Sequence, residues 1–127
     1  MDPYPSYHLI FQGSFNSAAG RLYDVVGDGP MVPVDIGGAS GYKYTVNLIA
    51  FPRDSNFPKV DFGVLEGKGP INGPSKPDSF TFNIRGTPNS NGYRLDLDGF
   101  TEDKVLFGTF DVLGGGGVGR GDLAGSK

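Results

Sequence analysis

Asp96 and Asp98 stand two residues apart and are the pair best suited to acid–base or metal chemistry. On an extended strand they would share one face, with Cα atoms about 7 Å apart. Paired carboxylates could cleave a glycosidic bond or ligate calcium. The same face is expected to carry polar and basic neighbours, some of them across a hairpin: Arg94, Thr81, Asn83 and Arg85. Because such a face is most often a solvated surface with cross-strand charge pairs, we predict no metal site and no catalytic pair here.

His8 is the only histidine, and the chain has no cysteine. A catalytic triad is a geometry, and the chain contains no G-x-S-x-G elbow to supply it. A single histidine cannot form a multi-histidine metal site, and the lack of cysteine excludes thiol nucleophiles, disulfides and zinc–thiolate sites. We therefore expect His8 on a polar surface and predict no bound metal or cofactor.

Three tyrosines, Tyr42, Tyr44 and Tyr93, are expected to point inward. They would share the interior with four phenylalanines: Phe62, Phe80, Phe82 and Phe107. Buried tyrosine hydroxyls need partners, so an open lumen lined by these rings would suit a small ligand. The alternative, which we favour, is that the rings fill the interior, since a barrel of eight strands can be solid.

Polar amides beside aromatic residues also mark two expected loops, through Arg53 and Asn56 and through Asn89 and Asn91. Shallow sugar sites use such side chains, and so do ordinary turns. Together with the three tyrosines, these four residues are our candidate ligand-binding residues.

Two motifs near the end of the chain have simpler explanations. Gly114, Gly116 and Gly119 match G-x-G-x-x-G, but a dinucleotide site needs a following helix that the remaining glycine-rich residues do not favour. Arg120-Gly121-Asp122 spells an integrin-binding tripeptide, which three residues match readily by chance. From about residue 114 we expect either a flexible tail or a strand with little side chain.

Charge and hydropathy restrict the partners. The net charge is −3, and the basic residues are scattered without a patch, which is not typical of nucleic-acid-binding proteins. No apolar run approaches the roughly 20 residues of a membrane helix, and the first residues lack the features of a signal peptide. We expect a soluble, cytoplasmic protein that binds neither nucleic acid nor membrane.

The elements that position these residues are predicted to be strands, because apolar and polar residues alternate with period two along most of the chain. We expect strands over residues 7–15, 21–26, 31–36, 42–51, 60–68, 79–85, 93–98 and 104–113. Gly27 to Pro30 would close the second strand, and Pro33 indicates an edge or a bulge in the third. Val60, Phe62 and Val64 would share a face, while the proline-rich stretch 69–77 would be irregular.

Lys104 to Leu113 differs from the other expected strands because it is apolar on both faces. One face would lie on the core. The other would be covered by a loop, a terminus or a second copy of the chain, which predicts a homo-oligomer through this strand.

This pattern predicts one all-β domain over residues 1–127, an antiparallel barrel of about eight strands, with a two-sheet sandwich or jelly roll as the alternative. Gly108-Thr109-Phe110 and Gly117-Val118-Gly119-Arg120 resemble the glycine-rich final strands of dirigent and allene-oxide-cyclase barrels. This resemblance implies a barrel, and we transfer no function from it.

For function, we expect a non-catalytic protein that binds a carbohydrate or a small apolar molecule. One alternative is a self-associating structural subunit. The other is a cofactor-free enzyme of cyclase or isomerase type, in which His8, Tyr42, Tyr44 and Tyr93 would be the catalytic candidates.

Overall fold

The computed structural model describes residues 4–76 and 79–127, and these form strands and turns without any helix. The strands are β1 (Tyr7–Asn16), β2 (Leu22–Ile36), β3 (Ala39–Pro52), β4 (Val60–Lys76), β5 (Ser79–Ile84), β6 (Gly86–Thr87), β7 (Arg94–Glu102), β8 (Val105–Gly114) and β9 (Gly117–Ser126). Accordingly, the described residues contain no helix long and apolar enough to cross a membrane.

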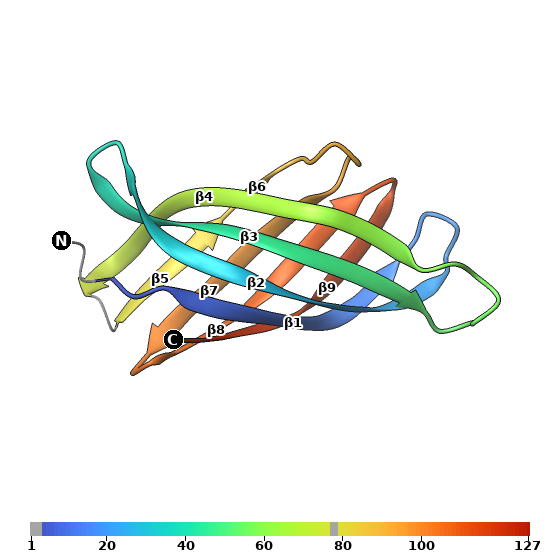
Figure 1. The fold of residues 1–127 in the computed structure, drawn as a ribbon, viewed down its shortest axis with the longest axis horizontal. Coiled ribbons are helices and arrows are strands. Elements are labelled where there is room, and N and C mark those ends of the chain that lie inside the picture. Colours follow the sequence, from blue (N-terminus) through green and yellow to red (C-terminus); the bar gives the residue numbers. More distant parts are fainter. Residues whose placement is uncertain (1–3, 77–78) are drawn as a thin grey trace.

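Eight of these strands close into an antiparallel barrel, and β6 is a short addition to it (Figure 1). Each long strand pairs with the next one in the chain, and β9 pairs with β1 to complete the circle. This confirms the predicted barrel. The sandwich alternative is wrong, because the hydrogen-bonded order runs around the whole wall without a break into two sheets.

Side chains alternate between the interior and the outside, as the period-two pattern predicted. Along β1, Tyr7, Leu9, Phe11 and Phe15 are buried, while the alternate residues His8, Ile10, Gln12 and Ser14 are exposed. The buried side chains of all the long strands form one hydrophobic cluster inside the barrel. Ring contacts extend across it, such as Phe11 against Phe110 with centroids 5.4 Å apart.

Aromatic residues close both ends of the interior. At one end the Tyr42 and Phe80 rings stack at 5.2 Å, Tyr4 packs edge-on against Phe80, and the Tyr42 hydroxyl donates to the carbonyl of Pro5 at 2.7 Å. The segment before β1 therefore covers this end.

The other end is closed by a second layer of rings. Phe62 packs edge-on against Phe15 at 5.1 Å and against Tyr93 at 4.7 Å, and Phe15 contacts Tyr23 at 6.0 Å. The interior is thus filled with side chains from one end to the other.

Two segments expected to interrupt strands are part of them. Gly27 to Pro30 does not close a strand, because β2 runs through it and pairs with both β1 and β3. Glycine is needed there: a Cβ on inward-facing Gly27 would lie 2.1 Å from the Asn47 carbonyl oxygen. Pro33 lies beyond the last pairing with β1, where β2 has only β3 as a neighbour, which agrees with the predicted edge.

Strand β4 is longer and less regular than predicted. Up to Lys76, residues 69–76 are strand and not irregular: Pro70 pairs opposite Gly41, and Ile71 opposite Phe82. Residue 77 of the predicted stretch lies outside the described residues. A bulge at Gly63, whose φ is +78°, reverses the alternation, so Val64 faces outward instead of sharing the face of Phe62.

The outer face of β8 is apolar at Val105 and Phe107 but not along its whole length, and Phe107 was predicted to face the core instead. Leu106, Phe110 and Val112 face the core, while Phe107 is 44% exposed on the outside. Of the two expectations for the glycine-rich end, the structure has the strand, because β9 pairs with β1 and β8.

Candidate functional site

Asp96 and Asp98 share the outer face of β7, as their spacing predicted. Asn83 on β5 lies opposite Asp98, and β8 places Thr109 opposite Asp98 and Asp111 opposite Asp96. Antiparallel pairing thus brings polar side chains from three neighbouring strands together on the outer wall.

These residues line a hollow of about 190 Å³, which we call the polar hollow. Its wall consists of Asn83, Arg85, Asp96, Leu97, Asp98, Thr109 and Asp111. Apart from Leu97, whose side chain is buried in the core, every member carries an amide, a hydroxyl or a charge. The lining of the hollow can therefore donate and accept several hydrogen bonds.

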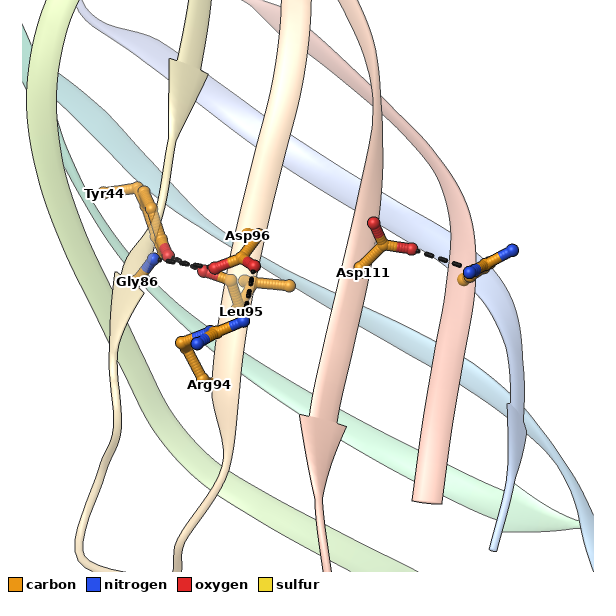
Figure 2. A network of polar contacts seen from close by, with 7 residues as sticks. Tyr44, Gly86, Arg94, Leu95, Asp96 and Asp111 are labelled. Atoms are coloured by element: carbon orange, nitrogen blue, oxygen red, sulfur yellow. Dashed lines mark hydrogen bonds and ion pairs between the residues drawn. The ribbon is translucent and has the colours of Figure 1, made fainter. Parts of the chain in front are cut away.

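Asp96 is the most enclosed of the three carboxylates, with 20% of its side chain exposed, and both its oxygens are engaged (Figure 2). Its Oδ1 accepts from the Gly86 backbone N–H at 3.0 Å, and its Oδ2 from the Arg94 guanidinium at 3.1 Å. Asp96 thereby ties β6 to β7.

Tyr44 lies behind Asp96, on the inner side of the wall, and its hydroxyl donates to the Leu95 carbonyl (Figure 2). The Tyr44 side chain passes close to two glycines. A Cβ on Gly67 would lie 2.7 Å from the Tyr44 hydroxyl oxygen, and a Cβ on Gly86 would lie 2.5 Å from it. Burial raises the pKa of Tyr44 well above its ordinary value, and the nearby Asp96 charge adds to the rise while Arg94 opposes it. The Tyr44 hydroxyl therefore stays neutral, and its hydrogen bond to Leu95 links β3 to β7.

Two charged side chains of the polar hollow form no ion pair within the described residues. Asp111 forms an ion pair with Arg120 at 3.2 Å, and Asp96 one with Arg94. Asp98 and Arg85 form no ion pair with any residue in the described part of the chain. Both remain available to a ligand.

Two observations bear on the chemistry that these residues could perform. No group of three or more potential metal-ligating side chains occurs among residues 4–76 and 79–127. Both carboxylate oxygens of Asp96 accept hydrogen bonds from within the barrel wall.

The three candidate tyrosines belong to the packed interior. Tyr42 and Tyr44 are fully buried, Tyr93 is half-buried, and none of them lines the outer hollows described here. The expectation that such rings fill the interior agrees with this packing. Ligand binding by these tyrosines stays a prediction.

Both polar atoms of the Asn89 side-chain amide form hydrogen bonds within the fold. Its Nδ2 donates to the carbonyls of Phe62 at 2.8 Å and Val64 at 3.0 Å, and its Oδ1 accepts from the backbone N–H groups of Asn91 and Tyr93, each at 3.0 Å. It joins the 85–93 segment to the bulged edge of β4.

The other loop candidates are more exposed. Arg53 forms an ion pair with Asp24 at 3.2 Å, while the side chains of Asn56 and Asn91 are exposed. The two loops lie at the same end of the barrel and stand apart in Figure 1.

His8 lies on the outer wall of β1, where we expected it. Its Nε2 is 3.0 Å from a carboxylate oxygen of Asp28, and both side chains are more than half exposed. The enzyme alternative had grouped His8 with three tyrosines that face the interior, so the wall separates the imidazole from them.

A second outer hollow, of about 310 Å³, lies beside the part of β2 and β3 that extends beyond the pairing with β1. Its lining includes Val34, Thr87 and two lysines, of which Lys43 is 3.5 Å from Glu66. The charges of its lining are therefore partly paired.

Comparison with known proteins does not add to this description. The chain matches no protein-family model, no curated protein and no solved structure.

Sequence reasoning did not single out Thr109 and Asp111 as site residues. They come from β8, whose register against β7 fixes them beside Asp98 and Asp96. Their alternation with Phe110 was the available signal, since it places both on the face opposite the core.

Proposed function

We propose that this chain is a non-catalytic binding protein whose ligand is a carbohydrate, held on the outer wall in the polar hollow. The observation that carries this proposal is a hollow of hydrogen-bonding groups outside a barrel whose interior is already full. The buried side chains pack against one another inside the barrel, so the outer wall is the better place for a ligand as large as a sugar ring.

The chemistry of the lining favours a sugar over a small apolar molecule. Asn83 can donate and accept, Thr109 can do both, Asp98 accepts, and Arg85 donates. Sugar hydroxyls also donate and accept, so they can satisfy all four. An apolar ligand would remove water from these groups without replacing their hydrogen bonds, which is unfavourable.

A glycan array followed by calorimetry with the best-bound glycan tests the proposal. Replacing Asn83 by Ala should weaken binding about tenfold, the effect of losing one or two hydrogen bonds to the ligand. Asn47→Ala is the matched control, because Asn47 is an exposed outward asparagine on β3, across the barrel. Its affinity should equal that of the wild type.

Two results would overturn the proposal. One is an array on which no glycan binds. The other is a glycan whose affinity is the same for the Asn83→Ala variant as for the wild type, since binding would then occur elsewhere.

A further inference from the structure

Four neighbouring strands present one continuous apolar row on the outside of the barrel. Phe100 on β7 lies opposite Phe107 on β8, Phe107 opposite Ala124 on β9, and Ala124 opposite Ile10 on β1. We call these four residues the outer apolar row. Phe100 and Phe107 are each 44% exposed and Ile10 is 59% exposed, and the two rings lie 5.9 Å apart.

This alignment distinguishes the row from scattered apolar side chains, which every protein surface carries. Val105 extends it on β8 with 38% exposure, and a shallow hollow lies beside Phe100, between Thr81 and Gly108. Adjacent exposed aromatic and aliphatic residues of this kind mark a contact surface.

The borders of the row carry unpaired negative charge. Asp98 and Asp122 stand two residues from Phe100 and Ala124 on one side, and Glu102 stands two residues from Phe100 on the other. None of these three forms an ion pair within the described residues. A partner that covers the row gains from positive charge at its edges.

We propose that the outer apolar row docks an apolar segment of another protein that carries lysine or arginine beside its apolar side chains. A second copy of this chain fits less well, because its own acidic borders would lie against these carboxylates and its net charge is also −3. All four row residues are paired on both sides, so the partner contacts side chains and does not add a strand.

This surface is distinct from the polar hollow, although Asp98 borders both. The test therefore leaves Asp98 unchanged and uses Asp122 and Glu102, which do not line that hollow. Failure of this proposal and failure of the carbohydrate proposal are thereby separable.

The probes are two synthetic peptides of equal length with the same apolar side chains, one with lysine and one with glutamate at its polar positions. They are titrated into the full chain labelled with ¹⁵N, and amide shifts are followed by NMR. The lysine peptide should shift amides of β7, β8, β9 and β1 around the row, and the glutamate peptide should not.

Variants locate the contact. Ile10→Ser and Phe107→Ser should each weaken the lysine peptide at least about tenfold, as expected for central interface residues. Asp122→Asn and Glu102→Gln should weaken it and reduce its salt dependence. Phe51→Ser is the control, because Phe51 is 46% exposed on β3, outside the row, and this variant should bind as the wild type does.

Thermal unfolding shows which variants fold. Ile10 is the most exposed of the large row residues, so Ile10→Ser is expected to fold and to test the contact even if Phe107→Ser does not fold. Equal binding of the two peptides, shifts centred elsewhere, or unchanged affinity of a folded Ile10→Ser variant would each overturn the proposal. Concentration-dependent shifts of the row without peptide would also overturn it, because a second copy would then be the partner.

Discussion

Asn89 takes the place of a strand partner that β4 lacks. The edge of β4 around Phe62 and Val64 receives two hydrogen bonds from one side-chain amide, and the same side chain accepts two more from its own loop. From the sequence, Asn89 and Asn91 were equivalent candidates for ligand binding. Only the bulge at Gly63, which the sequence did not predict, explains why the first of them is structural.

Asn89→Ala should lower the free energy of unfolding by about 2 kcal/mol, because it leaves partly buried carbonyl and N–H groups without partners. Asn91→Ala, at an exposed side chain two residues away, should change it by less than about 0.5 kcal/mol. Urea unfolding of both variants measures the difference. Equal stability of the two variants would show that the Asn89 bonds do not hold the 85–93 segment.

Tyr44 gives the barrel a specific dependence on alkaline pH. Its pKa is raised in the folded protein, above an ordinary value of 10.0, so the unfolded chain releases the hydroxyl proton first as pH increases. Its contribution to stability is therefore complete below pH 10 and is lost as pH rises toward the folded-state pKa.

Thermal unfolding of the wild type and of Tyr44→Phe, compared between pH 8 and pH 11, tests this prediction. The wild type should lose more stability than the variant over this range, because phenylalanine has no proton to release. A parallel decline of the two proteins would contradict the assigned role of the buried hydroxyl.

Along the strands, several inward-facing glycines lie where a side chain would collide with a neighbouring strand. Gly108 on β8 faces the interior, and a Cβ there would lie 2.3 Å from the Asp98 carbonyl oxygen. This explains why the residues on either side of Gly108, Phe107 and Thr109, must face outward. The sequence pattern alone was ambiguous at Phe107, because apolar residues occupy both faces at the start of β8.

Gly108→Ala should lower stability by about 1–3 kcal/mol, the range for forcing extra atoms into a packed site. Gly69→Ala is the matched control: Gly69 also faces the interior, but its Cβ would meet Ile84 atoms at 3.4–3.8 Å, which is ordinary contact. Chemical unfolding should separate the two variants clearly. A Gly108→Ala protein as stable as Gly69→Ala would mean that this close approach does not require glycine.

The sequence predicted most of the strands, because alternation is a local property. It did not predict the continuity of β2 through Gly27 to Pro30 or of β4 through Pro70, since both depend on pairing with distant strands. Glycine and proline usually interrupt strands, but here the bends they permit are part of the barrel wall.

For the molecule as a whole, the packed interior of the barrel is the reason why our proposals place both ligands on the outer wall. Aromatic rings occupy both ends and the middle, so the functional groups that remain accessible lie on the outer wall. The polar hollow and the outer apolar row are neighbours there, on β7 and β8. The sequence predicted the polar side chains of β5 and β7, but the contribution of β8 depended on a register that only the structure gives.

NMR mapping of the carbohydrate site distinguishes a ligand bound on the outer wall, as we propose, from one bound inside the barrel. The best glycan from the array is titrated into the chain with labelled amides and methyl groups. Shifts should concentrate at Asn83, Asp98 and Thr109, while the interior methyl groups of Met31 and Leu48 stay unchanged. Shifts of those interior methyl groups with an unaffected outer wall would contradict the account, because the ligand would then lie inside the barrel.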